Sequence, residues 1–251
     1  GSAGRPLGAP RVSHRVARWV APSARTLPPA MAAPAAASDP KRVAKVLEFM
    51  NTAGKLKEVK RTGWVRSGVR GAESVADHMY RMAMMGFALG SADGLDSGKC
   101  IKMALVHDLA ESVVGDLVVE GEKHRQDKIT REEKTRLERT ALHNICSNLG
   151  GEAGEEIRNL WEEFETGETP EARHLRDLDK FEMVLQASEY EQGQSMALPD
   201  FFRTTEGKFT TPIFKALDQE VRARRAKRLK EEEEAHGAAG EAKRARTEEP
   251  A

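Results

Sequence analysis

Apolar side chains recur every three or four residues through most of the chain between residues 38 and 220, which is the spacing of amphipathic helices. Ser38 or Asp39 can cap the first predicted helix, and Pro40 suits its first turn. The apolar stripe of this helix comprises Val43, Val46, Leu47 and Met50. No segment alternates apolar and polar residues with the period of two that an amphipathic strand requires. The pattern therefore predicts an all-α fold.

Further helices are expected wherever the same period returns. They cover residues 73–90, 97–115, 129–150, 154–191 and 198–225. The helix over 97–115 is apolar on nearly all sides, so we expect it to be buried. Thr130 followed by Glu133 resembles a capping box, and the stretch from Gly167 to Pro170 divides 154–191 into two helices. Residues 61–74 are expected to form a loop.

The two ends of the chain differ in composition from its middle. Residues 1–37 are rich in Ala, Pro and Arg and contain no acid, so we expect a disordered N-terminal segment there. This segment is an expression tag, upstream translation before Met31, or a transit peptide. Residues 221–251 form a block of mixed charges and are expected to be a disordered C-terminal tail. One domain is therefore predicted over residues 38–220.

Charge and cysteine content exclude several classes of protein. Lysine and arginine number 40 and so do aspartate and glutamate, so no net field predicts a nucleic-acid polymer or a membrane as partner. The longest apolar run, Met82–Gly90, is half of the ~18 residues that a membrane helix needs. Cys100 and Cys146 are too few for a disulfide framework, which favours a reducing compartment. We expect a cytoplasmic protein, or a plastid or mitochondrial one if residues 1–37 are a transit peptide.

Polar residues interrupt the apolar stripes of three predicted helices. They are His78, His107, Asp108 and Asp179. A buried, unpaired carboxylate costs several kcal/mol, and a divalent cation bound by neutral imidazoles and ionised carboxylates removes that cost. The alternatives are histidines satisfied within the core, and an Asp179 that pairs with Lys180 or Arg176. The two imidazoles favour Mn²⁺, Co²⁺ or Fe²⁺, with Mg²⁺ as the alternative.

The ordered pattern H…HD…D resembles the metal motif of the HD-domain phosphohydrolases. Three segments resemble more narrowly the HD domain-containing 5′-deoxynucleotidases, over about residues 43–215. These segments are "ESVADHMYRMA", "ALVHDLAESVVGDL" and "LDKFEMVLQASEYE". The resemblance implies a helical HD-domain bundle that hydrolyses 2′-deoxyribonucleoside 5′-monophosphates to deoxynucleoside and phosphate, with broad base tolerance. It also implies a homodimer.

Two acidic residues follow the His-Asp pair. Glu111 lies one helical turn beyond His107, and Asp116 follows Gly115, where a helix can stop. From the residues alone, Glu111 could be exposed and Asp116 could simply begin a turn. The family pattern "HDxxE…GD" implies that both are catalytic. Glu111 would orient the attacking water, and Asp116 would contact the phosphate ester and deliver the proton, although these roles could be exchanged. Alternatively, both hold a second, Mg²⁺-like ion.

The segment "VKRTGWV" contains candidate substrate-binding residues. Arg61 can clamp a phosphate through two parallel N–H donors, and Trp64 offers a flat face for a sugar or base. In the bacterial relatives the arginine and tryptophan are adjacent, whereas two residues separate them here. Trp64 could instead be a core aromatic residue. Arg66 and Arg70 are alternative phosphate partners.

Two rival functions remain at this point. One is another phosphohydrolase on the same scaffold: a cyclic-nucleotide phosphodiesterase, a (p)ppGpp hydrolase or a dNTPase. Such enzymes usually carry extra metal ligands or nucleotide-binding insertions, and we find neither in a domain this short. The other is a non-catalytic HD binding module. The intact set of ligands and acids argues against it.

Overall fold

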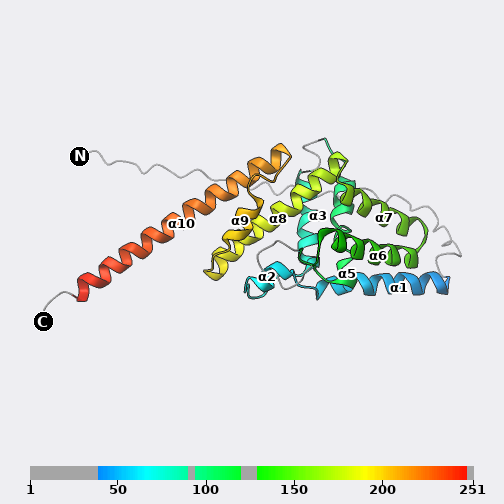
Figure 1. The fold of residues 1–251 in the computed structure, drawn as a ribbon, viewed down its shortest axis with the longest axis horizontal. Coiled ribbons are helices and arrows are strands. Elements are labelled where there is room, and N and C mark those ends of the chain that lie inside the picture. The colour runs from blue at the N-terminus through cyan, green and yellow to red at the C-terminus, as the bar shows by residue number, and fades with distance from the viewer. Residues whose placement is uncertain (1–38, 90–93, 120–128, 248–251) are drawn as a thin grey trace, which may run out of the picture. The chain divides into compact units, whose positions relative to one another are not determined.

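The structure is a computed structural model that describes residues 39–89, 94–119 and 129–247. The predicted N-terminal segment, residues 1–37, lies outside these ranges. Helices make up nearly all of the regular structure (Figure 1). They are α1 (Pro40–Gly54), η2 (Lys55–Lys57), α2 (Thr62–Arg66), α3 (Val75–Leu89), α4 (Ser97–Ala104), α5 (Glu111–Val114), α6 (Arg131–Leu149), α7 (Gly151–Thr166), α8 (Pro170–Gln194), α9 (Pro199–Thr205) and α10 (Pro212–Thr247).

Extended pairing within the described ranges is limited to one isolated antiparallel bridge, between Lys60 and Ser74. The predicted all-α fold is therefore confirmed. The segment 61–74, expected to be a loop, contains the short helix α2. Among the described helices, none combines the length and the apolar character needed to cross a membrane.

Local capping explains where several helices begin. The Asp39 carboxylate accepts a hydrogen bond from the Lys41 backbone N–H at 3.1 Å, and Pro40 follows as the first helical residue. Thr130 caps α6 in the same way through the Glu133 N–H at 3.1 Å. Between α7 and α8 the chain turns at Gly167, whose φ of +65° is left-handed. The predicted break in 154–191 is therefore confirmed.

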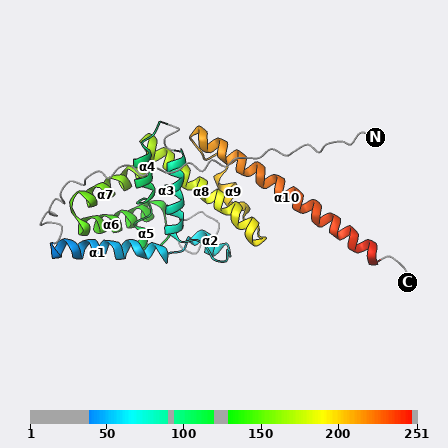
Figure 2. The ribbon, with the colours of Figure 1, turned by 180° about the vertical axis from the view of Figure 1, so that it is seen from behind.

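Helix α8 is central to the packing, because it contacts α3, α4, α7, α9 and α10 (Figure 2). Its buried apolar residues join the larger of two core clusters, which also contains Trp64, Met82 and Phe214. The second cluster draws residues from α3, α6 and α7, among them Val75, Leu142 and Trp161. Side chains on the inner faces of α3 and α8 are thus held from several directions.

The helix predicted over 97–115 is interrupted. Helix α4 ends at Ala104, residues 105–110 form turns, and α5 begins at Glu111. The backbone tightens there to hydrogen bonds across three residues, such as Leu109 N to Val106 O at 3.1 Å and Glu111 N to Asp108 O at 3.0 Å. Residues 97–115 are apolar on nearly all sides of a helix, so their hydrophobic pattern does not show where the helix is interrupted.

The stripe predicted on α1 does not all face the core. Val43, Leu47 and Met50 are exposed, and Val46 is the one member of the predicted stripe that is partly buried. Phe49, which the prediction left out, is also partly buried. Helix α3 has a second exposed apolar stripe, formed by Tyr80, Met84 and Phe87. Both stripes have the spacing of one helix face.

Helix α10 continues past residue 220 as far as Thr247, so the predicted domain boundary falls inside a helix. Ion pairs four residues apart support the helix beyond that point, including Lys227–Glu231 at 3.8 Å and Lys230–Glu234 at 3.7 Å. Only residues 248–251 of the predicted tail lie outside the described ranges.

Buried ion pairs join α8 to α10. Glu191 on α8 is 2% exposed and accepts hydrogen bonds from Arg225 at 2.6 Å and from Arg228 at 2.9 Å. It also accepts one from the Leu198 backbone N–H, just before α9, at 2.8 Å. One carboxylate thus joins three helical segments.

We therefore predict that Glu191→Ala lowers the free energy of unfolding by about 2–4 kcal/mol, because two arginines lose their shared partner in a largely buried position. Glu220→Ala is the control, since its pair with Arg224 is exposed, and it should cost at most about 0.5 kcal/mol. Urea denaturation measures both values. Equal losses would contradict the role of Glu191.

Candidate metal centre

The structure brings the four predicted metal ligands together. His78 comes from α3, His107 and Asp108 from the turn between α4 and α5, and Asp179 from α8. The His78 Nε2 atom lies 3.2 Å from Asp179 Oδ1 and 3.8 Å from Asp108 Oδ2. The His107 Nε2 atom lies 3.2 Å from the same Asp108 oxygen. Ligand atoms of His78, His107 and Asp179 all lie within 4.8 Å of one another.

Neighbouring groups orient both imidazole rings. The Nδ1 atom of His107 lies 2.9 Å from the Ala104 carbonyl oxygen, and that of His78 lies 2.6 Å from Glu182 Oε2. Each Nδ1–H therefore donates outward, which leaves the lone pair of a neutral ring on Nε2. Both Nε2 atoms are buried and make no hydrogen bond among the described residues. Two inward-facing lone pairs beside two carboxylates fit a divalent cation.

The electrostatics of the cluster favour a positive charge at its centre. Burial and Arg61 lower the pKa of His78, but the neighbouring carboxylates of Asp179 and Glu182 outweigh them and raise it to about 9, so a cation that binds at Nε2 displaces a proton from the ring. Burial raises the pKa of Asp179, but His78, His107 and Arg61 lower it to about 2. Both aspartates in the cluster therefore remain ionised at neutral pH.

The alternative partners of Asp179 are engaged elsewhere. Lys180 donates to the Arg176 carbonyl oxygen at 2.8 Å, and Arg176 donates to the Glu165 carbonyl oxygen at 3.0 Å. The Asp179 side chain instead faces His78. Simple pairing with a sequence neighbour therefore does not explain this carboxylate.

Glu182 and Arg81 form a supporting pair that sequence reasoning missed. Glu182 is fully buried, and its second oxygen accepts a hydrogen bond from Arg81 Nε at 2.8 Å. Each follows a predicted ligand by three residues, His78 on α3 and Asp179 on α8. That spacing is the one signal in the sequence, because residues three apart share a helix face.

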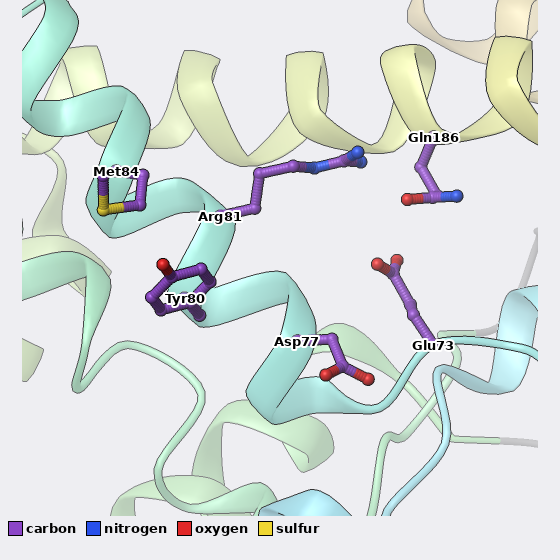
Figure 3. Close-up of a pocket in the computed structure, with 6 residues that line it drawn as sticks. All are labelled: Glu73, Asp77, Tyr80, Arg81, Met84 and Gln186. Carbon is purple, nitrogen blue, oxygen red and sulfur yellow. The ribbon is translucent and has the colours of Figure 1, made fainter.

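A cavity of about 390 Å³, separate from the one that three of the predicted metal ligands line, lies next to Arg81 (Figure 3). Glu73 and Gln186 point toward each other across it, and the Arg81 guanidinium extends toward α8. The remaining lining residues are Asp77, Tyr80 and Met84. No predicted site residue lines this cavity. Its wall carries Arg81, which holds Glu182 from outside.

Glu111 is buried beside the metal cluster. It is 1% exposed, and neither carboxylate oxygen has a hydrogen-bond partner among the described residues. Burial raises its pKa, as do Asp108 and Asp116. Lys134 on α6 places its ammonium group beside Glu111, with Nζ 3.8 Å from Oε1. The alternative of an exposed Glu111 is therefore wrong.

Asp116 is turned back toward α2. Its Oδ2 atom accepts a hydrogen bond from the Thr62 backbone N–H at 2.6 Å, and its carbonyl oxygen accepts one from the Thr62 hydroxyl at 2.7 Å. Gly115, with a φ of +78°, makes the turn that sends the chain there. Asp116 therefore does more than begin a turn, because it fixes the start of α2.

Arg61 precedes α2 and reaches the metal cluster. Its Nη1 atom lies 3.2 Å from Asp108 Oδ2, and its Nη2 atom lies 4.0 Å from Asp179 Oδ1. Trp64 is 2% exposed and donates from its indole nitrogen to Glu73 at 2.8 Å. The structure therefore agrees with the core alternative for Trp64, which offers almost no surface to a ligand.

A cavity of about 610 Å³ contains most of these groups. His107, Asp108, Asp179, Arg61, Glu111 and Asp116 line it. Helix α6 contributes Lys134 and Glu138, and α9 contributes Phe201 and Thr204. The cavity thus joins a charged metal cluster to an aromatic wall.

Comparison with known proteins gives a family and several relatives. The HD domain family model matches residues 53–222. A 5′-deoxynucleotidase HDDC2 of Dictyostelium discoideum is 51% identical over 183 residues, covering 68% of this chain and 93% of the relative. The Homo sapiens protein of the same name is 43% identical over 183 residues, covering 72% and 86%. A conserved hypothetical protein from Pyrococcus furiosus, a solved structure, is 30% identical with a TM-score of 0.58, covering 70% and 99%.

The geometry predicts that Mn²⁺ stabilises the folded protein. At a concentration a hundred times the dissociation constant, binding contributes about 2.7 kcal/mol, which raises the melting temperature by about 5–10 °C. Asp179→Asn should lose most of this increase, because an amide supplies no charge to the cation. Asp200→Asn is the matched control, since Asp200 pairs with Arg203 at the surface, and it should keep the increase. Differential scanning fluorimetry with and without Mn²⁺ measures all three; an unchanged response of Asp179→Asn would rule out this ligand.

Proposed function

This chain belongs to the HD domain family, and on that premise we propose that it is a 5′-deoxynucleotidase. It is a metal-dependent phosphomonoesterase that hydrolyses 2′-deoxyribonucleoside 5′-monophosphates to deoxynucleoside and phosphate, with broad base tolerance. The observation that carries the proposal is the convergence of two inward-facing imidazoles and two carboxylates, of which His107, Asp108 and Asp179 line one cavity and His78 lies buried behind them. The names of the relatives from Dictyostelium discoideum and Homo sapiens support the same activity.

A divalent ion is the cofactor, and its ligands are His78, His107, Asp108 and Asp179. The two imidazoles favour Mn²⁺, Co²⁺ or Fe²⁺, with Mg²⁺ as the alternative. Such an ion, when bound, activates a water molecule as nucleophile and offsets charge on the phosphoryl oxygens. Glu182 fixes the ring of His78, and the Ala104 carbonyl oxygen fixes the ring of His107.

The other residues of the cavity handle the phosphate and the protons. Arg61 binds phosphoryl oxygens through its two N–H donors, since its guanidinium already faces the cluster. Glu111 orients the attacking water and accepts its proton, because its oxygens make no hydrogen bond within the described part of the chain and its pKa is raised by burial. Asp116 contacts the ester and relays to the leaving oxygen the proton that Glu111 accepts from the water. The roles of the two acids are interchangeable, and a second, Mg²⁺-like ion held by both remains the alternative.

The protein forms a homodimer in this proposal, and the exposed stripes of α1 and α3 support it. Contiguous exposed apolar side chains mark surfaces for a partner. Light scattering should give twice the chain mass of 27.7 kDa. A double change, Met84→Lys with Phe87→Lys, should shift the mass toward the monomer if α3 forms the interface. An unchanged dimer would assign the interface elsewhere.

The compartment and the remaining partners are proposed from the sequence. We place the protein in the cytoplasm, with a plastid or mitochondrion as the alternative if residues 1–37 act as a transit peptide. No nucleic-acid polymer and no membrane is a partner in this proposal. Fluorescent fusions with and without residues 1–37 test the location: an organellar signal that needs this segment would exclude the cytoplasm.

We predict that dAMP is hydrolysed to deoxyadenosine and phosphate, that AMP is hydrolysed more slowly, and that cyclic AMP, (p)ppGpp and dATP are left intact, with substrates and products separated by chromatography. A chelator should abolish the reaction, and Mn²⁺ or Co²⁺ should restore it. His107→Ala should lower kcat/KM for dAMP by more than about a hundredfold, because a metal ligand is lost. His143→Ala is the control, since this histidine pairs with Glu162 outside the cavity. A preference for cyclic AMP, (p)ppGpp or dATP would favour the rival phosphohydrolases, and no turnover of any substrate would favour a binding module.

A further inference from the structure

Among the described residues, three aromatic side chains line the 610 Å³ cavity, and two of them, Trp64 and Phe164, are buried. Trp64 is buried, but Phe201 on α9 is partly exposed and lies against it, with ring centroids 4.2 Å apart and planes tilted by 31°. Tyr190 also packs edge-on against Trp64, with ring centroids 5.3 Å apart. Trp64 therefore backs Phe201, and Phe201 offers the accessible face.

Helix α2 links this face to the charged part of the cavity. Arg61, which contacts the metal cluster, is the N-cap of α2, and Gly63 follows two residues later. The Phe201 ring lies over Gly63, since a Cβ built there would be 3.5 Å from Phe201 Cε1. Phe201 is therefore close to the phosphate-binding side of the cavity.

Apolar residues from a second segment extend the same wall. Asp116 is bound to Thr62 through both its carboxylate and its carbonyl oxygen, so the chain that follows it begins beside α2. This chain, residues 117–119, also lines the cavity with Leu117, Val118 and Val119. Met183, one turn beyond Asp179 on α8, contributes a further apolar side chain. The cavity thus combines a strongly charged region with an apolar region next to α2.

A nucleoside monophosphate has the same division, with a charged phosphate at one end and a flat, weakly polar base at the other. Stacking of a base on an aromatic side chain contributes about 1–3 kcal/mol, and it tolerates every base because each has a π-face. A stacking contact therefore suits an enzyme with broad base tolerance better than hydrogen bonds to base edges would.

We propose that Phe201 is the nucleobase platform of this site, stacking on the base of the bound nucleotide while Trp64 holds its ring in position. This inference rests on the proposed function and assigns it a specificity-determining residue on α9. Trp64 acts through Phe201 and is a positioning residue. Base tolerance then follows from the use of a ring face.

The test compares dAMP with 2-deoxyribose 5-phosphate, which has the same phosphate and sugar but no base. Phe201→Leu should lower kcat/KM for dAMP about tenfold, mainly through KM, because stacking acts on ground state and transition state alike. The same change should leave kcat/KM for 2-deoxyribose 5-phosphate within about twofold. Phe201→Tyr keeps the ring and should restore the value for dAMP.

Phe202→Leu is the matched control, because Phe202 is the adjacent phenylalanine of α9 and is buried in the core. A packing defect in α9 should change kcat/KM for both substrates by the same factor. If Phe201→Leu behaves in that way, or if it changes neither substrate, the platform assignment is overturned. Loss confined to dAMP supports it.

Binding of deoxyadenosine separates this inference from the proposed function, since it needs no phosphate chemistry. Saturation-transfer NMR should show the adenine protons in contact with the wild-type protein, and Phe201→Leu should remove most of that signal. If the wild-type protein hydrolyses neither phosphate ester, the proposed function fails, whereas this NMR comparison still decides the platform. An adenine signal that is absent from the wild-type protein or unchanged in Phe201→Leu overturns the inference.

Discussion

Two imidazoles and two carboxylates share a small, largely buried volume, and their need for mutual compensation is the constraint on which the rest of the fold depends. Each group would cost several kcal/mol if it were buried alone. Glu182 and the Ala104 carbonyl oxygen turn both rings so that their lone pairs face inward. Arg81 in turn compensates the charge of the buried Glu182. The cluster is therefore held by groups that a cation would not displace, which is what a preformed metal site requires.

The interruption between α4 and α5 follows from the same constraint. Adjacent residues on a regular α-helix point about 100° apart, so His107 and Asp108 would diverge there. The tight turns over residues 105–110 bring the His107 Nε2 atom to 3.2 Å from Asp108 Oδ2. They also start α5 at Glu111, which becomes buried beside the cluster. A uniformly apolar stretch with a His-Asp pair at its centre is compatible with one helix or two, and only the tertiary requirement decides between them.

The same distinction between local and tertiary signals explains which features of the structure the sequence predicts. Helices with local signals were predicted well: Asp39 and Thr130 cap their helices as expected, and Gly167 ends α7. The face of α3 that carries His78 is buried as its spacing indicates. Features that depend on distant contacts were not predictable. Glu182 shares a helix face with Asp179, but its contact with His78 joins residues 104 positions apart in the sequence. No local signal shows that the outer residues of the α1 stripe are exposed while Phe49 packs inward.

The positions of Arg61 and Trp64 also depend on contacts that are distant in the sequence. Arg61 is the N-cap of the short helix that contains Trp64, yet Arg61 reaches the metal cluster whereas Trp64 enters the core. Of the two residues between them, Thr62 binds Asp116 twice and Gly63 lies under the Phe201 ring. Helix α2 therefore ties the charged part of the cavity to its aromatic wall through consecutive positions. A substrate that spans both parts would bind across α2, with its phosphate beside Arg61, and α9 would then contact the part of the substrate that varies.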